Sequence, residues 1–488
     1  MPCTTILVGK KATYDGSTMM ARNEDSGAGH FMPKKWIIVN PEDQPQHYVS
    51  VLSGVEIDLP EDPLRYNAVP NAVPDAGVWG ESGFNSCNVA MSETETITSN
   101  ARVLGADPLV KEGIGEEDML TITLPYIRSA REGVLRLGAL LEKYGTYEMN
   151  GIGFQDQEEI WWLESIGGHN WIAKKVPDDC YAVIPNQQGI DDFDFSDACG
   201  EGKEHMCSNG LPELIERFHL DLVCDETPIR ERKHFDVRAA LGSHTDHDHT
   251  YNTPRAWVME KLLNPTTFVW EGEDADFTPF SDDLPWCLVP EKKITPEEVK
   301  EVLSNVYQGT PYDPYGPQAE RKDRLKLRPI GINRNNFVML TQLRKDLPDP
   351  LKAVEWIAMG SNAFNAFVPF YAAVKDTPAY LRDTGAKVDT GSLYWASRLI
   401  GALADSEYHL CAGDVDWYQK QMAAFAESHL AKTDRSFLET QPENAEEFLE
   451  KANLAAAEAA REMTDEALGR VLHVVSNCMK NAFSRSDG

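Results

Sequence analysis

The sequence predicts an α+β protein in which a sandwich of β-sheets is covered by helices. Short β-branched segments separated by turns dominate the first half of the chain, and segments with helical periodicity follow later, in pairs. From Val415 onward the sequence is almost wholly helix-forming. Because strands are followed by helices instead of alternating strictly with them, a doubly wound parallel sheet is disfavoured.

The chain opens with a predicted hairpin. Residues 3–9 form its first strand, residues 14–17 (Tyr-Asp-Gly-Ser) its turn and residues 18–22 its second strand. The two ends of this hairpin are therefore expected to lie close together. Further strands are predicted over residues 36–40, 88–92, 151–154, 160–164, 171–175, 181–184 and 337–342.

Helical periodicity predicts the later elements. Helices are expected over residues 118–144, with Gly145 as a stop, and over 255–263, 295–307 and 353–359. Within the Ala- and Glu-rich tail, residues 443–474 carry Leu449, Leu454, Ala457 and Ala460 at helical spacing. Residues 185–250 and 271–283 are predicted to be long acidic loops, and no linker separates independent domains.

The charge balance is strongly acidic. Among 488 residues, 78 Asp and Glu outnumber 46 Lys and Arg, which gives a formal charge of −32. Binding to phosphate backbones or anionic lipid requires clustered Lys and Arg, so nucleic acid is not an expected partner. No stretch of about 18 uncharged apolar residues is present, so no membrane span is predicted.

Compartment and redox state follow from the N-terminus and the cysteines. The apolar run near the N-terminus is too short for a secretory signal, which needs about 7–15 apolar residues, so the cytoplasm is expected. The nine cysteines are odd in number and never form a C-x-x-C pair. This pattern disfavours both a disulfide framework and a thiolate zinc site.

Cys3 is the candidate nucleophile because it begins the first strand. A thiol can attack a carbonyl if a base removes its proton, and a residue at a free N-terminus carries such a base in its own α-amino group. The hairpin is expected to return Arg22 and Asp25 beside Cys3. An arginine favours the thiolate and a carboxylate can hold the amine. The alternative is that Cys3 fills a core position and that Arg22 and Asp25 are a solvated strand end.

Ordered motifs extend this pattern along the chain. They are CTTILVG with the return strand ARNEDS, GVWGESGFNSCNVAMSETETI (77–97), WWLESIGGHNWIAKKVPDDCYAVIPNQQGI (161–190), YNTPRAW (251–257), YQGTPYD (307–313), RPIGINR (328–334), GSNAFNAFVPFY (360–371) and LYWASRL (393–399). In these motifs the sequence resembles the bacterial dipeptidase A family of N-terminal-nucleophile (Ntn) cysteine peptidases, and more distantly penicillin V acylases and bile-salt hydrolases. The resemblance implies a four-layer αββα sandwich of the Ntn-hydrolase type with a helical C-terminal extension, and hydrolysis of dipeptides. It covers residues 3–411, which suggests a dipeptidase domain there and a mainly helical region packed on it over 412–488.

The resemblance also implies roles for individual residues. Cys3 would be the nucleophile, with Arg22 and Asp25 beside it. Asn186 would supply an oxyanion-hole side chain, and Arg255 would be a charged support of the site. A second oxyanion donor is expected from the backbone near Glu93, at the end of strand 88–92. No cofactor and no metal are expected, dipeptides are the expected substrates, and assembly into a homo-oligomer stays open.

The N-terminus departs from the family pattern. Removal of Met1 would still leave Pro2 ahead of Cys3. The proposed mechanism therefore requires that Pro2 be removed as well, because the α-amino group of Cys3 is otherwise a peptide nitrogen. If Cys3 stays blocked, the chain would instead be a non-catalytic binding relative.

Two further functions stay open at this stage. A cluster of His244, Asp246, His247, Asp248 and His249 could bind a metal if its side chains converge, as in a metal-dependent dipeptidase. Such a run in an acidic loop is more often solvated, and no H-E-x-x-H motif is present. A related amidase or acylase would keep the cysteine mechanism but act on another acyl-amide.

Overall fold

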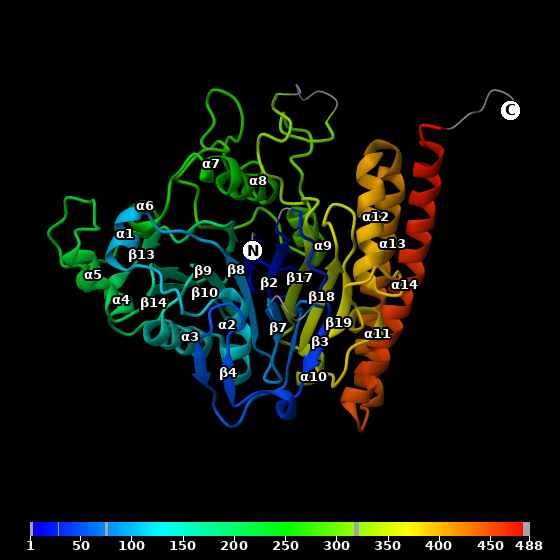
Figure 1. Ribbon diagram of the computed structural model, residues 1–488, viewed down its shortest axis with the longest axis horizontal. Coiled ribbons are helices and arrows are strands. Elements are labelled where there is room, and N and C mark those ends of the chain that lie inside the picture. Colours follow the sequence, from blue (N-terminus) through cyan, green and yellow to red (C-terminus); the bar gives the residue numbers. More distant parts are fainter. Residues whose placement is uncertain (1–2, 28, 74–76, 317–321, 482–488) are drawn as a thin grey trace, which may run out of the picture.

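Two β-sheets lie face to face at the centre of the molecule, with helices on both outer sides (Figure 1). The computed structural model describes residues 3–27, 29–73, 77–316 and 322–481. Neighbouring strands within each of these two sheets are antiparallel. The seven-stranded sheet has the order β16 (Cys287–Leu288), β12 (Tyr181–Ile184), β1 (Cys3–Val8), β2 (Thr18–Asp25), β17 (Asn335–Leu343), β18 (Ala353–Met359) and β19 (Val368–Tyr371). The six-stranded sheet has the order β14 (His205–Cys207), β11 (Asn170–Lys175), β10 (Ile160–Ile166), β9 (Asn150–Gln155), β8 (Ala90–Glu95) and β7 (Ser82–Phe84).

Helices form the two outer layers. Helices α2 (Glu116–Thr123) and α3 (Ala130–Tyr144) cover the six-stranded sheet. The seven-stranded sheet is covered by α8 (Thr253–Leu263), α9 (Pro296–Leu303), α12 (Leu393–Ser406), α13 (Tyr408–Thr440) and α14 (Ala445–Asn477). The order of layers is thus helix, sheet, sheet, helix, which confirms the αββα sandwich with a helical C-terminal region.

The remaining elements are short and lie at the ends and edges of the sandwich. The small strand pairs are β3 (Ile37–Val39) with β6 (Tyr66–Ala68), β4 (His47–Val49) with β5 (Glu56–Asp58), and β13 (Asp192–Phe193) with β15 (Phe235–Asp236). The short helices are α1 (Ala101–Ala106), α4 (Phe195–Ala198), α5 (Leu211–Arg217), α6 (Val237–Leu241), α7 (Asp248–Tyr251), α10 (Asp349–Lys352) and α11 (Ala379–Arg382).

The alternation of side chains along the strands builds three adjoining core layers. In β1, Ile6 and Val8 pack toward α8 and α9, whereas Leu7 packs between the two sheets. In β10, Trp162 lies between the sheets and Trp161 packs under α3. Successive strand residues point to opposite faces, and helices cover the outer face of each sheet, so both sheets are buried on both sides. Most of the buried strand side chains are apolar, but β2 also buries Arg22, Glu24 and Asp25.

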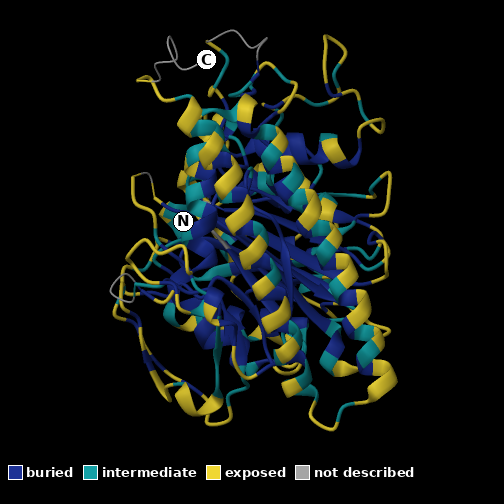
Figure 2. Cartoon of the chain, turned by 90° about the vertical axis from the view of Figure 1, so that its right-hand side faces the viewer, coloured by how far each residue is buried: buried dark blue, intermediate teal, exposed yellow. Residues whose placement is uncertain are grey.

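The two long C-terminal helices, α13 and α14, each bury one face against the rest of the protein. Figure 2 shows them with exposed residues along their outer faces and buried residues toward the sheet. Asn453 of α14 is fully buried; its side chain accepts a hydrogen bond from the Tyr371 amide and donates one to the Tyr371 carbonyl, both at 2.9 Å. Helix α14 therefore closes the hydrogen-bonding edge of β19, an edge that would otherwise be open to a further strand.

Most predicted elements are present. The opening hairpin is confirmed, and each further predicted strand coincides with an observed one. The helix predicted over 118–144 is interrupted, because Pro125 cannot donate a backbone hydrogen bond and the Ser129 side chain caps a new helix by accepting from the Glu132 amide. The helix predicted over 295–307 ends at Leu303.

Two sequence predictions are wrong. Residues 353–359 form strand β18, because this short apolar run pairs with β17 on one side and β19 on the other, a situation that periodicity alone cannot distinguish from a helix. The segment 185–250 contains short strands and helices, β13 to β15 and α4 to α7, instead of one loop. Leu454 is 56% exposed, and its neighbour Asn453 takes the inward position.

The proposed domain boundary falls within a helix. Residue 411 is a buried cysteine in α13, which begins at Tyr408. No helix in the described part of the chain is long and apolar enough to cross a membrane.

Candidate active site

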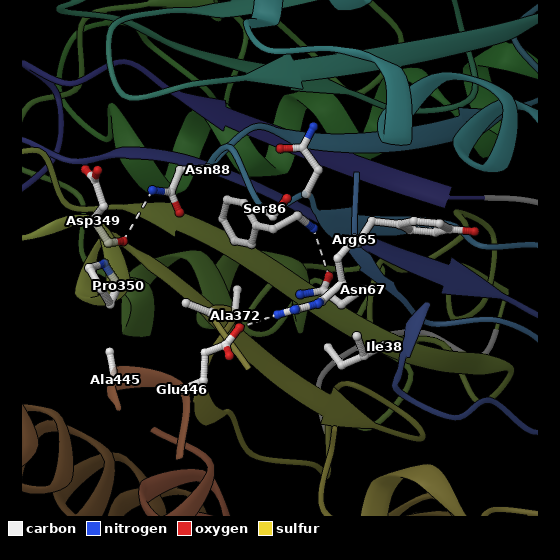
Figure 3. A pocket seen from close by; sticks show the side chains of 14 residues that line it. Ile38, Arg65, Asn67, Ser86, Asn88, Asp349, Pro350, Ala372, Ala445 and Glu446 are labelled. Carbon is white, nitrogen blue, oxygen red and sulfur yellow. Dashed lines mark hydrogen bonds and ion pairs between the residues drawn. The ribbon is translucent and has the colours of Figure 1, made fainter. Parts of the chain in front are cut away.

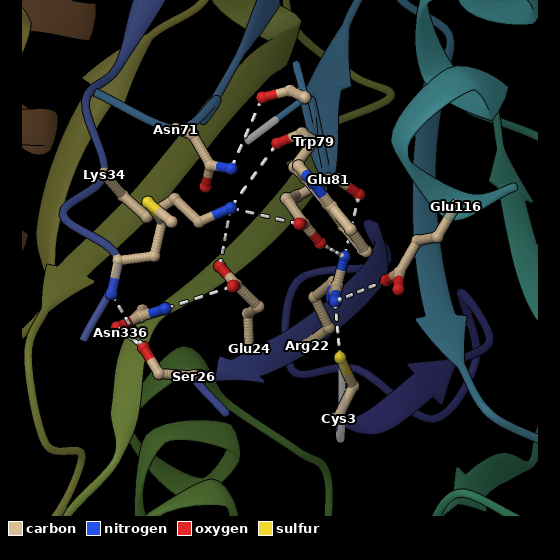
Figure 4. Close-up of polar contacts among 12 residues, drawn as sticks. Cys3, Arg22, Glu24, Ser26, Lys34, Asn71, Trp79, Glu81, Glu116 and Asn336 are labelled. Atoms are coloured by element: carbon tan, nitrogen blue, oxygen red, sulfur yellow. Dashed lines mark hydrogen bonds and ion pairs between the residues drawn. The ribbon is translucent and has the colours of Figure 1, made fainter. Parts of the chain in front are cut away.

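Cys3 begins strand β1, and the register of the hairpin brings Arg22 to its sulfur. Cys3 lies opposite Glu24 and Thr5 opposite Arg22 on β2, so all four side chains share one face of the sheet. The Arg22 Nη2 donates to the Cys3 Sγ at 2.5 Å, and both side chains are fully buried (Figure 4). The predicted contact between thiol and guanidinium is present.

Buried carboxylates fix the Arg22 guanidinium. Its Nη1 forms an ion pair with Glu81, and its Nη2 donates to Glu116 Oε1 at 3.1 Å (Figure 4). Lys34 lies between Glu24 and Glu81, at 2.9 and 3.0 Å. All of these side chains have no exposed surface. Two cations and three carboxylates thus form one network that holds Arg22 against the sulfur.

This network determines the ionisation of the thiol. Burial raises the pKa of Cys3 to about 12; Arg22 opposes this effect, and Glu116 adds to it. Burial also raises the pKa of Glu116 to about 7. The neighbouring Glu93 has a pKa well above its usual range, because it is buried and faces Glu116 and Glu81. In this state Cys3 is a neutral thiol at pH 7, so catalysis requires a base that removes its proton.

Asn186 and Arg255 meet at the backbone of Cys3. Asn186 Oδ1 accepts from the Cys3 backbone nitrogen at 3.2 Å and from Arg255 Nη2 at 2.7 Å. Since the oxygen is occupied by these two donors, the amide nitrogen of Asn186 is the atom that can donate to a substrate oxygen. The structure therefore brings Asn186 to the backbone of the candidate nucleophile, and its role as an oxyanion donor stays a prediction.

Arg255 extends from α8 and is fully buried. Its guanidinium donates to the Cys3 carbonyl, to Thr4 Oγ1 at 2.7 Å, to the Tyr251 carbonyl at 2.8 Å, to Asn186 Oδ1 and to Asn252 Oδ1 at 2.7 Å. A guanidinium has five N–H donors, and here each has an acceptor in the protein. Arg255 therefore positions the start of β1 and Asn186 and has no donor left for a substrate.

Asp25 lies on the other face of the sheet from Cys3. It is three residues after Arg22 in a strand, so the two side chains point in opposite directions. The contacts described for its carboxylate are an ion pair with Arg328 and a hydrogen bond from Asn335 Nδ2. Arg328, the ion-pair partner of Asp25, interacts electrostatically with Cys3, so a place of Asp25 close to the nucleophile stays a prediction.

The backbone of Glu93 is also engaged. Its N–H donates to the Glu81 carbonyl at 3.2 Å. An oxyanion donor at this amide would require that bond to break.

The His and Asp side chains of residues 244–249 do not all meet at one point. His244 and His249 both approach Asp282, at 3.4 and 2.9 Å, whereas His247 stacks on the Tyr251 ring. Asp248 accepts hydrogen bonds from Ser243, Thr245 and Asn252. Within residues 3–27, 29–73, 77–316 and 322–481, no three His, Cys, Asp or Glu side chains are grouped as metal ligands.

A cavity of about 420 Å³ lies beside Asn186. Its lining includes Tyr251, His247 and Arg334, together with Ser243, Asn252 and several threonines. A separate cavity of about 240 Å³ is lined by Arg65 and Glu446, which form an ion pair at 2.6 Å (Figure 3). Only the first of these cavities is lined by a residue that bonds to Cys3.

Sequence reasoning missed the partners of Arg22. Glu81 and Glu116 lie 59 and 94 residues away from it along the chain. Each acid looks like an ordinary surface residue in the sequence, and only the stacking of the two sheets makes it a buried partner. Glu81 lies in motif 77–97, which is one of the motifs that carry the family resemblance. That motif was the only indication in the sequence that Glu81 belongs to the site.

The αββα layers, with a buried cysteine at the start of a central strand and an arginine on its sulfur, define a cysteine hydrolase of the Ntn type. The sequence matches Peptidase family C69 over residues 2–421, and the chain belongs to that family.

Relatives of high similarity cover the whole chain. A protein of Bifidobacterium longum named "Dipeptidase" is 48% identical over 100% of both chains. The "Probable dipeptidase A" of Streptococcus pyogenes serotype M3 is 49% identical, also over 100% of both, and the "Dipeptidase A" of Lactobacillus helveticus is 40% identical over 96% of both. Penicillin V acylase from Agrobacterium tumefaciens covers 80% of this chain and 92% of its own at 12% identity and a TM-score of 0.34, a likeness too distant to support a conclusion.

Proposed function

We propose that this protein is a dipeptidase in which Cys3 attacks the peptide bond of a dipeptide. The observation that carries the proposal is the 2.5 Å contact between Arg22 Nη2 and Cys3 Sγ at the start of β1, next to Asn186. The substrate class follows the names of full-length relatives of this peptidase family.

The reaction requires the α-amino group of Cys3 in its free form. This amine takes the thiol proton as Sγ bonds to the scissile carbonyl carbon, and the Asn186 amide nitrogen donates to the oxygen that becomes negative. The amine then gives the proton to the leaving nitrogen, the C–N bond breaks, and a thioester remains on Cys3. Water attacks the thioester, releases the first amino acid and restores the thiol.

Arg22 and Arg255 have different tasks in this scheme. Arg22 stabilises negative charge on the sulfur, because its guanidinium faces Sγ and is fully buried. Arg255 donates hydrogen bonds to the Cys3 carbonyl and to the Asn186 side-chain oxygen, so it fixes the position of the nucleophile relative to the oxyanion donor. Removal of both Met1 and Pro2 is part of the proposal, since Cys3 is otherwise blocked.

Residues 3–411 carry the proposed catalytic unit. In the C-terminal region, predicted from residue 412 to 488, α13 and α14 pack on its seven-stranded sheet. We assign the reaction to the cytoplasm, with support from the nine cysteines, none of which forms a disulfide within the described part of the chain. A charge of −32 favours small zwitterionic substrates over nucleic acid or anionic membranes.

The test combines the N-terminal state with the loss of the thiol. Intact mass is expected to show a chain that begins at Cys3, and Cys3→Ala is expected to abolish dipeptide hydrolysis without lowering the melting temperature. Cys87→Ala, which changes an exposed cysteine, serves as the matched control and should keep full activity. Full activity of Cys3→Ala would refute the cysteine mechanism.

A further inference from the structure

A dipeptide carries a free carboxylate one residue beyond the bond that is cut, and the acidic protein must offer a cation to it. Arg255 was the residue that sequence reasoning put forward as a charged support. Its five donors are all bound to acceptors within the protein. The substrate carboxylate therefore needs a different partner.

Arg334 is the Lys or Arg side chain that lines the cavity beside Asn186, among the residues that the structure describes. Its Nη2 donates to the Tyr251 hydroxyl at 2.6 Å, and its Nη1 donates to the Ser26 carbonyl at 3.3 Å. Its own carbonyl accepts from the Ser26 amide at 2.8 Å. The guanidinium is thus held between the end of β2 and α7, with donors to spare.

The charge of Arg334 is not balanced by a carboxylate. No ion pair joins it to an acid in the described part of the chain, although the protein has 32 more acidic than basic residues. The one acid in the described cavity lining, Asp248, is already bound to Ser243, Thr245 and Asn252. By contrast, Arg65 in the cavity of Figure 3 is neutralised by Glu446.

The sheet register places Arg334 within reach of the scissile bond. Cys3 lies opposite Glu24 on β2, and Glu24 lies opposite Phe337 on β17, so the start of β17 is two strands away from Cys3. Two strand spacings amount to about 10 Å, and Arg334 lies up to about 10 Å further along the strand direction, so the backbone separation is about 14 Å, which an extended arginine and a bound dipeptide together can span. The cavity of about 420 Å³ is lined by both Asn186, which bonds to the Cys3 backbone, and Arg334, and it has room for the leaving residue.

We propose that Arg334 binds the C-terminal carboxylate of the dipeptide and thereby selects substrates in which a single residue follows the scissile bond. This inference rests on the proposed dipeptidase function. A guanidinium and a carboxylate form charge-assisted, bidentate hydrogen bonds, which favour a terminal carboxylate over an amide of the same shape. The Tyr251 hydroxyl acts as the positioning group that holds the guanidinium toward the cavity.

The test compares alanylalanine with alanylalanine amide, which differ only in the terminal charge. For the wild-type enzyme, kcat/KM is expected to be about 10²-fold higher for the acid than for the amide. Arg334→Met should lower kcat/KM for the acid by about 10²-fold and change it for the amide by less than about threefold. Arg334→Lys should restore part of the preference, because it keeps the charge without the bidentate geometry.

Arg65→Met is the matched control, since Arg65 also lines a cavity but is paired with Glu446, and its kinetics should equal those of the wild type. A wild type that cleaves acid and amide equally, or an Arg334→Met variant that loses both activities alike, would overturn the assignment. If Arg334→Met does not fold, the ratio of the wild-type kcat/KM values for the acid and the amide still tests whether the terminal carboxylate is recognised. A wild type that cleaves neither compound would refute the dipeptidase function itself, and this inference with it.

Discussion

Replacement of Glu116 by Gln should make Cys3 more reactive, and only above about neutral pH. Glu116 Oε1 and Cys3 Sγ both accept from Arg22 Nη2, so the two acceptors lie within a few ångströms of each other. A negative charge there opposes formation of the thiolate. The amide of Gln keeps an oxygen for Arg22 but carries no charge.

The size of the effect follows from this geometry. At a separation of about 5 Å and an effective dielectric constant near 20, the charge costs the thiolate about 3.3 kcal/mol, which corresponds to about 250-fold less thiolate. A thiolate of lower pKa is also a weaker nucleophile, so the net gain in alkylation rate is about 20-fold. Because the pKa of Glu116 is about 7, this carboxyl is mostly neutral at pH 5.5 and ionised at pH 9.

The assay is the rate of Cys3 alkylation by iodoacetamide, followed by mass spectrometry of the N-terminal peptide. Both proteins must share the same N-terminus, which intact mass checks. Burial of Cys3 slows the reagent equally in the two proteins, so the ratio of rates is the quantity of interest. We expect a ratio of about 20 at pH 9 and below about 2 at pH 5.5. Equal rates at pH 9, or a ratio that does not depend on pH, would refute the electrostatic account.

Four further outcomes are expected. Asn186→Ala should lower kcat by about 10²–10³ with little change in KM, because the lost donor acts mainly in the transition state, and unchanged kcat would exclude that role. Arg255→Lys should lower kcat and the melting temperature but leave KM nearly unchanged, since all donors of Arg255 serve the protein; a large rise in KM would instead indicate contact with substrate. Activity should survive exhaustive dialysis against EDTA, and loss that zinc restores would favour the metal-dependent alternative. Asn453→Ala should reduce the free energy of unfolding in urea by about 1–3 kcal/mol, because two backbone groups of β19 lose their partner, whereas Leu454→Ala, at an exposed position of the same helix, should have little effect.

Local periodicity was enough to predict that Cys3 and Arg22 lie next to each other. A turn at residues 14–17 and two strands place Arg22 on the face of Cys3, and the observed register agrees. Asp25 is an odd number of residues from Arg22, so in a regular strand its side chain lies on the other face, where Arg328 is its ion-pair partner. The family resemblance led correctly to Asn186 and Arg255 as neighbours of the Cys3 backbone.

The rest of the site depends on contacts that no local pattern encodes. Glu81 and Glu116 become partners of Arg22 only because the second sheet stacks on the first. Strand β18 was misread as a helix because a seven-residue apolar run has no period of its own until its neighbours are known. Arg334 was part of a quoted motif, yet its lack of a carboxylate partner is visible only in three dimensions.

The burial of Cys3 restricts when the N-terminus can mature. Strand β1 is an inner strand of its sheet, with β12 and β2 on its two sides. Arg255 of α8 donates hydrogen bonds to the first residues of this strand, Cys3 and Thr4. A separate peptidase has to hold the residues on both sides of the bond that it cuts, and Cys3 has no exposed surface to be held by. Under the proposed mechanism, residues 1 and 2 would therefore leave while the nascent chain is still unfolded, or be cut off by the folded molecule itself. In either case a fully folded chain that still bears Pro2 cannot be rescued by an external enzyme.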